Sequence, residues 1–300
     1  MELWVPLTIA AAFFQNIRSA LQKHLQGRLS TIGAAYVRFI YALPVAIIYL
    51  FGVVLYRDGS LPEVTTEFLF YCLAGGLCQI FFTLFLLWLF SFHNFAVGTT
   101  FSKLETIVVA VFGLLLLGDD LSPTLILAIG LSTIGLVILS AAQSHLTFRN
   151  LLTGLWRKPT LIGIGCAIWL GACAVFFRAA SLSLQLDDYL LSAAFTLLIV
   201  LILQTVVMGS WMFWRDRGEF TKVFIHWRPA AAVGLSGGLT SIGWFTAFTL
   251  QSATYVRALG QIELLFTFIV TIFFFREKIT SGEFAGIGLI SLSIILVLSG

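Results

Sequence analysis

The chain has 300 residues, of which 59% are hydrophobic and only 10% are charged, and its mean hydropathy is +1.02. Soluble domains carry about 25% charged residues, so this composition excludes an ordinary soluble fold and indicates an integral membrane protein. The formal net charge of +3 is too small to suggest a nucleic-acid partner, and the expected partner is the lipid bilayer.

Apolar runs of the length that a membrane-spanning helix needs, about 20 residues, follow one another along the whole chain. We predict an all-α polytopic membrane protein with ten transmembrane helices near 4–22, 32–55, 68–90, 95–117, 121–142, 161–182, 189–213, 230–250, 255–275 and 279–298. The first run is not expected to be a cleavable signal peptide, because "MELWV" carries an acid where such a peptide has basic residues. The four cysteines lie inside apolar runs and are predicted to be small core residues.

Two segments far apart in the chain match each other. Residues 101–122, "FSKLETIVVAVFGLLLLGDDLS", align without a gap on residues 259–280, "LGQIELLFTFIVTIFFFREKIT", at a constant offset of 158. Glu105 then falls on Glu263, so the match includes polar residues that a random apolar sequence would rarely align. A duplication with an odd number of helices per unit places the second unit upside down in the membrane. Many transporters use such inverted repeats to build two alternately open faces around a central site.

Each unit ends in a turn with an acid and a hydroxyl residue, "GDDLS" or "REKIT", before a last helix that contains glycine. In this the whole chain resembles the drug/metabolite transporter superfamily, and most closely its ten-helix EamA-type exporters. The corresponding units are 1–142 and 161–300, with 143–160 as the connector. The chain departs from the family pattern in its Asp119-Asp120 pair, and it lacks a proline that is usual near the head of the fourth and ninth helices.

The resemblance implies a secondary transporter that exports small polar metabolites, such as amino acids or organic anions, by alternating access. It implies no enzymatic activity and no cofactor. A multidrug or cation efflux pump is the alternative. A metal-dependent intramembrane enzyme is a further one, since the acid pairs at 119–120 and 187–188 could hold Mg²⁺. These pairs precede helices, however, and are predicted to cap them; no metal motif accompanies them.

Two acids lie deep inside predicted helices. Glu105 and Glu263 sit about ten residues from the start of the fourth and ninth helices, which at 1.5 Å per residue is roughly 13 Å deep. A charge at this depth costs at least ~2.5–3.5 kcal/mol, so such residues face the interior of a bundle or a wet cavity. We predict that they bind the substrate or carry a coupling proton. The alternative is structural pairing, Glu105 with Arg18 and Glu263 with Arg178.

Five cations accompany these acids: Arg18, Arg38, Lys103, Arg178 and Arg257. Lys103 has no cationic counterpart, because Gln261 occupies its mirror position, and we predict an asymmetric contact of Lys103 with the substrate. Arg18, Arg178 and Arg257 are candidate substrate contacts that could instead reach the membrane interface, and Arg38 is interpreted as a tether of the second helix. The excess of cations over acids favours an anionic or zwitterionic substrate.

Several uncharged side chains are candidates for the wall of a central cavity between helices 1, 3, 4, 6, 8 and 9. They are Gln79, Trp88, Trp169, Trp244, Tyr255 and Gln261, with plain packing as the alternative for each tryptophan. The glycines of "GLSGGLTSIG" and "GEFAGIG" are predicted to let helix backbones approach closely.

Lysine and arginine near helix ends are distributed unequally between the two sides of the predicted membrane. The odd-numbered loops hold eleven of them and the opposite side, which includes both termini, holds Arg57 alone. The positive-inside rule therefore predicts outward-facing termini for a multi-pass protein of the inner (plasma) membrane. Two complementary halves make a monomer sufficient.

Overall fold

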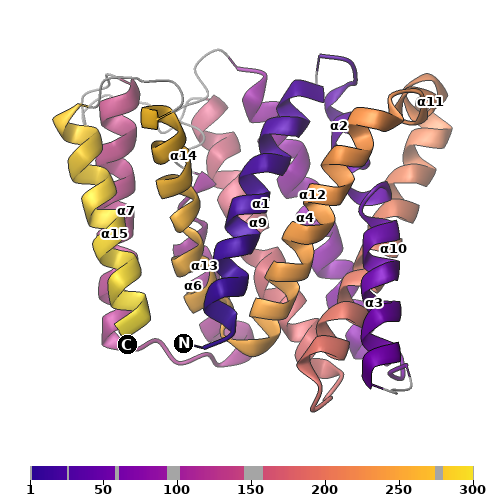
Figure 1. Ribbon diagram of the computed structural model, residues 1–300, viewed down its shortest axis with the longest axis horizontal. Coiled ribbons are helices and arrows are strands. Elements are labelled where there is room, and N and C mark those ends of the chain that lie inside the picture. Colours follow the sequence, from indigo (N-terminus) through magenta and orange to yellow (C-terminus); the bar gives the residue numbers. More distant parts are fainter. Residues whose placement is uncertain are drawn as a thin grey trace.

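The structure is a computed structural model, and it describes residues 2–25, 27–57, 61–92, 102–144, 158–273 and 280–299. All regular secondary structure in these ranges is helical. The first half contains α1 (Trp4–Leu25), α2 (Thr31–Ile40), α3 (Leu43–Arg57), α4 (Thr66–Phe90), α6 (Glu105–Phe112), the π-helical turn η1 (Gly113–Leu117) and α7 (Pro123–Ser144). The second half contains α9 (Lys158–Ser183), α10 (Tyr189–Arg215), α11 (Arg217–Ile225), α12 (Trp227–Leu250), α13 (Ala253–Gly260), α14 (Ile262–Phe273) and α15 (Ser281–Ser299). The long helices stand side by side across one slab, and both termini lie at the same end of it (Figure 1).

Seven segments are long and apolar enough to cross a membrane. They are 31–57, which joins α2 to α3, 66–89, 123–142, 158–183, 189–215, 227–250 and 281–299. Ten spans were predicted, and the described residues do not confirm that number. The helix α1 is 22 residues long, but Gln15, Asn16, Arg18 and Gln22 lower its hydropathy. The fourth and ninth predicted helices are each broken into shorter pieces in the structure. Most of the connector and the turn that contains Glu277 lie outside the described residues.

Short polar side chains fix where several helices begin. Asp188 accepts hydrogen bonds from the backbone N–H groups of the first turn of α10, which confirms the cap predicted for that acid pair. The prediction for the other pair is wrong. Ser122, and neither Asp119 nor Asp120, accepts the N–H of Leu125 at the start of α7, since Ser122 directly precedes Pro123, the first residue of that helix.

Helices from the two halves pack mainly against each other. The most extensive pairings are α4 with α9, α7 with α15 and α1 with α12. If the halves correspond as predicted, α1 matches α9 and α4 matches α12, so the first and third pairings are images of one another. The pairing pattern is thus compatible with a duplication, which itself stays a prediction.

Glycine allows α7 and α15 to touch along their backbones. A Cβ atom added to Gly135 would lie 2.8 Å from the carbonyl oxygen of Gly286, and one added to Gly286 would lie 2.8 Å from that of Gly135. This confirms the close packing predicted for "GEFAGIG". The four cysteines are buried and unpaired, as the sequence predicts.

Candidate functional site: a cavity between two arginines

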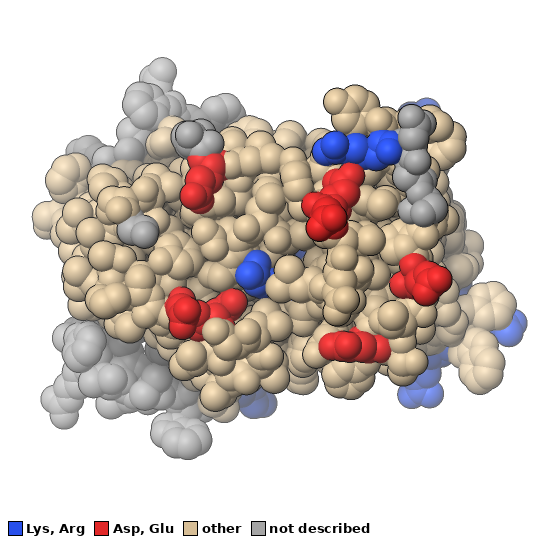
Figure 2. All heavy atoms as spheres, turned by 90° about the horizontal axis from the view of Figure 1, so that it is seen from below, with Lys and Arg blue, Asp and Glu red and all other residues tan. Residues whose placement is uncertain are grey.

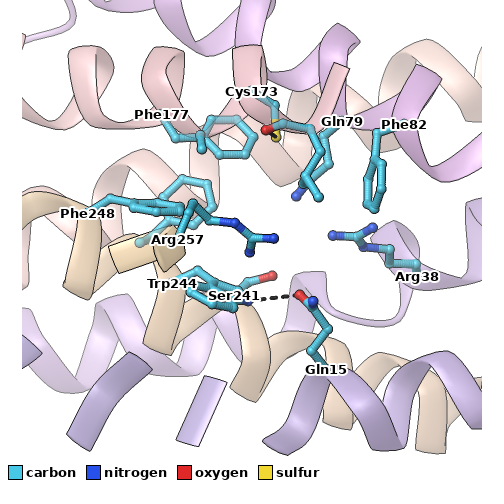
Figure 3. A pocket seen from close by; sticks show the side chains of 13 residues that line it. Gln15, Arg38, Gln79, Phe82, Cys173, Phe177, Ser241, Trp244, Phe248 and Arg257 are labelled. Carbon is cyan, nitrogen blue, oxygen red and sulfur yellow. Dashed lines mark hydrogen bonds between the residues drawn. The ribbon is translucent and has the colours of Figure 1, made fainter. Parts of the chain in front are cut away.

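A narrow cavity lies in the middle of the bundle, between the two halves of the chain. Side chains from α1, α2, α4, α9, α12 and α13 line it (Figure 3). Its volume of about 30 Å³ is room for one or two water molecules. The predicted lining differs in one helix: the described part of the fourth helix does not line the cavity, whereas α2 does.

Two guanidinium groups point toward each other across this cavity (Figure 3). Arg38 is 6% exposed, donates a hydrogen bond of 2.7 Å to the Thr83 hydroxyl, and forms no ion pair with any described residue. Arg257 is 3% exposed, and its Cζ lies 4.6 Å from the ring centroid of Trp244. The aromatic face therefore supports one arginine, and a neutral hydroxyl holds the other.

Arg257 is neutralised by Glu105. The Nη2 atom of Arg257 donates to Oε1 of Glu105, and both side chains are almost fully buried. The pair is incomplete, because Oε2 of Glu105 and Nε of Arg257 are buried without a hydrogen-bond partner. Glu105 is the first residue of α6, where the helix dipole stabilises a negative charge.

The second buried acid is neutralised from the first half of the chain. Lys103 forms an ion pair with Oε1 of Glu263, and Gln15 donates to Oε2 of the same carboxylate at 2.6 Å. Gln15 in turn accepts a 3.0 Å hydrogen bond from Nε1 of Trp244 (Figure 3). This chain of contacts connects Glu263, which does not line the cavity, to two residues that do.

The structural pairs expected from the repeat were wrong. Glu105 pairs with Arg257 instead of Arg18, and Glu263 pairs with Lys103 instead of Arg178. The reason is that the two broken segments meet each other: α6 packs against α13, so the acid near each break meets a cation of the opposite segment.

Both broken segments expose backbone groups in the middle of the bundle. Gln261 separates α13 from α14, and Lys103 and Leu104 precede α6 at the corresponding place. The Gln261 side chain donates to the Thr106 hydroxyl at 3.1 Å and to the Lys103 carbonyl at 3.4 Å. Irregular backbone at membrane depth is tolerated where protein buries it or where it lines a cavity, and here Gln261 satisfies part of it.

Arg18 lies beside this site, and it forms no ion pair with any residue that the structure describes. It is 2% exposed, and its Nε and Nη1 atoms are buried with no hydrogen-bond partner. Its Cδ atom lies 3.4 Å from the position that a Cβ of Gly237 would take, so the side chain runs along the bare backbone of α12. Arg18 is also within electrostatic range of Arg38 and Arg257.

Arg178 lies elsewhere, near the end of the bundle that holds both termini. Its Nε is 3.8 Å from Oδ1 of Asp119, and its Nη1 donates to the carbonyl groups of Phe248, at 2.8 Å, and Gln251. The Phe248 ring lines the cavity, so this cluster lies just beyond the cavity wall. Burial raises the pKa of the Asp119 carboxyl above its ordinary value of 3.8, and the charge of Arg178 offsets part of that rise.

The uncharged candidates divide between the cavity and other places. Gln79 and Trp244 line the cavity, and Gln79 also accepts a hydrogen bond from Gln204 at 2.8 Å. Tyr255 shares a 2.9 Å hydrogen bond with Ser122, near the Arg178 cluster. Two tryptophans are outside the lining: Trp88 is 47% exposed, and Trp169 packs on the ring of Phe81.

Sequence reasoning missed Gln15 and Ser241 as lining residues and undervalued Arg38. A signal for Gln15 was present, because Gln15, Arg18 and Gln22 are three and four residues apart and share one face of α1. A polar face on an apolar helix indicates a side turned toward the interior of the bundle.

Comparison with known proteins places the first half of the chain in a family. The family model of the EamA-like transporters matches residues 2–141. Residues 2–141 belong to the EamA-like transporter family. This family is part of the drug/metabolite transporter superfamily, and the match, together with the seven long apolar segments, supports a multi-pass membrane transporter.

Solved structures show how far the fold extends. Of 28 matching chains, one that is described only as "Crystal structure of protein" superposes with a TM-score of 0.69 at 13% sequence identity. The superposition covers 98% of this chain and 95% of that one, so the shared fold includes both halves. A search of curated protein sequences gave no match.

Proposed function

We propose that this EamA-like transporter exports a small anionic or zwitterionic metabolite, and that the cavity between Arg38 and Arg257 is its binding site. The observation that carries the proposal is the meeting of two buried guanidinium groups in one cavity (Figure 3). A guanidinium fork matches the geometry of a carboxylate or phosphate group and is attracted to it strongly in a buried site.

The same two groups argue against the cation-pump alternative. An amine in this cavity would lie between two positive charges, of which Arg38 has no described acid beside it. Like charges that are brought together in a site of low dielectric repel strongly. The aromatic walls formed by Trp244 and Phe248 therefore serve the apolar part of an anionic or zwitterionic metabolite.

Transport requires the cavity to open, because about 30 Å³ does not hold a metabolite. We propose alternating access between the halves. Toward the end with the termini, the contacts that must break are those of Arg178 with Asp119 and Gln251, together with the hydrogen bond between Tyr255 and Ser122. With the termini outward, as the lysine and arginine distribution favours, these contacts close the outer side. Figure 2 views this end and shows many acidic and few basic side chains on it.

The buried glutamates are the proposed coupling groups. Protonation of Glu105 would neutralise its carboxylate and leave the Arg257 guanidinium free for an anionic substrate. Protonation of Glu263 would likewise release Lys103. Because the proton and the anion are then bound at the same time, they would cross the membrane together and in the same direction.

The experiment compares metabolites in the medium and cytosol of cells that express the wild type, Arg38→Gln or the double variant Glu105→Gln/Glu263→Gln. We expect an anionic or zwitterionic compound to redistribute with the wild type and to stay in place with Arg38→Gln. The glutamate variant is expected to abolish the pH dependence of transport. Redistribution of an organic cation instead, unaffected by Arg38→Gln, would refute the proposed substrate class.

A further inference from the structure

The most unusual group in this molecule is the Arg18 guanidinium. It is buried at 2% exposure, and two of its nitrogen atoms have no hydrogen-bond partner among the described residues. Unlike lysine, arginine does not lose its proton in proteins, so the positive charge persists despite burial. An uncompensated buried charge costs several kcal/mol, so a complementary charge is needed in at least one state of the protein.

The positive charges around the cavity outnumber the negative ones. Arg18 is within electrostatic range of three other cations: Arg38, Arg257 and Lys103. Two acids, Glu105 and Glu263, face them through the ion pairs with Arg257 and Lys103. Among the described residues the centre therefore retains two positive charges, those of Arg18 and Arg38.

The two excess positive charges belong to arginines that lie close together. Arg38 reaches into the cavity, where its guanidinium donates a hydrogen bond to the neutral Thr83 hydroxyl. Arg18 runs along Gly237, and the backbone carbonyl of Arg38 lies 3.8 Å from the Cβ position of that glycine. Gly237 thus lies between the stem of Arg18 and the backbone of Arg38, which places the two arginines next to each other.

We infer that the transported metabolite is a dianion, a dicarboxylate or a phosphate monoester, whose second negative charge is recognised by Arg18. This inference rests on the proposed function, because it uses the same cavity and adds only the charge of its ligand. A monoanion would compensate Arg38 and leave Arg18 buried with an unmatched charge. A dianion would compensate both, and its additional oxygen atoms would accept the two free N–H groups of Arg18.

The test measures thermal unfolding of the purified full-length protein in detergent at pH 7 and constant ionic strength. The probes are acetate as the monoanion, succinate as the dicarboxylate, methyl phosphate as the phosphate monoester, and putrescine as the cation. A ligand that binds only the folded state raises the unfolding midpoint with its concentration. We expect succinate or methyl phosphate to reach half of the maximal shift at a concentration at least about tenfold lower than acetate, the gain from one additional charge-assisted contact. The better of the two identifies the kind of dianion.

Arg18→Gln should remove this preference, so that the dianion and acetate differ by less than about threefold. Arg228→Gln, an exposed arginine of α12, is the matched control and should keep the wild-type preference. Arg18→Lys retains the charge and should keep a weakened preference, which serves as the test if Arg18→Gln does not fold.

The outcomes separate the two proposals. Equal binding of acetate and the dianions, unchanged in Arg18→Gln, would overturn the dianion inference and leave the anion site in place. Stabilisation by putrescine alone would overturn the proposed function and this inference together. No shift with any of the three anions would also overturn both.

Discussion

The ion pair between Glu105 and Arg257 holds the two broken segments together, and its contribution to stability can be predicted from its burial. The side chains are 2% and 4% exposed. Removing one partner of so buried a pair leaves an uncompensated charge, which costs about 3–5 kcal/mol. We expect Glu105→Gln and Arg257→Gln each to lower the free energy of unfolding by about this amount. Arg257→Gln should cost more, because it also loses the contact with Trp244.

The double variant Glu105→Gln/Arg257→Gln should be less destabilised than either single variant, because it leaves no unpaired charge. The interaction energy from this double-mutant cycle is expected to exceed about 2 kcal/mol. Reversible unfolding of the detergent-solubilised protein, followed by fluorescence or circular dichroism, gives the four free energies. Arg57→Gln breaks the half-exposed pair with Asp188 and should cost less than about 1 kcal/mol. Additive effects of the two central substitutions would refute the reasoning.

Two further predictions concern packing and pH. Gly135→Ala should destabilise the protein by about 1–3 kcal/mol, because the added methyl group would meet the backbone of α15 at Gly286. Gly130→Ala in the same helix is the control: its methyl group has open space and should not destabilise the protein. Thermal unfolding of the two variants, with equal midpoints as the contradicting result, decides this. Burial raises the pKa of Asp119 in the folded state, so the folded protein holds that proton more tightly than the unfolded chain. The contribution of Asp119 to the free energy of unfolding therefore decreases as pH rises from about 4 through the raised pKa. Asp119→Asn should remove this part of the pH dependence without losing stability at pH 7. The unfolding midpoints of the wild type and the variant at pH 4 and pH 7 measure the effect. An unchanged pH profile would contradict the prediction.

Composition predicted the class of fold because a chain with 10% charged residues can fold only where most of its surface is apolar. The burial of Glu105 and Glu263 was also predictable, since an acid inside a long apolar run is expected to face the interior of a bundle. Both side chains are buried in the structure.

The partners of these acids were not predictable from the sequence. The residues of each ion pair are more than 150 positions apart, and which cation meets which acid depends on how α6 and α13 cross. The ion pairs predicted from the repeat assumed that the fourth and ninth helices are straight. The breaks at Lys103 and Gln261 shift the neighbouring side chains and change their partners.

Arg38 shows a second limit. Within the run 32–55 it lies near one end, which favours an interfacial position. In the structure the run divides at Tyr41 and Ala42 into α2 and α3, with Pro44 in the first turn of α3. This division lets α2 turn inward and carry Arg38 into the cavity, and the sequence offered only the proline as a sign of it.

The central claim is that the cavity is the path of transport and opens to both sides of the membrane. Ser241 lines the cavity, so Ser241→Cys in a variant whose four native cysteines are replaced by alanine provides a unique thiol there. The measurement is its reaction with a membrane-impermeant maleimide in right-side-out and in inside-out vesicles. We expect labelling from either side, slowed by the transported anion. Labelling from one side only, or from neither, would contradict it.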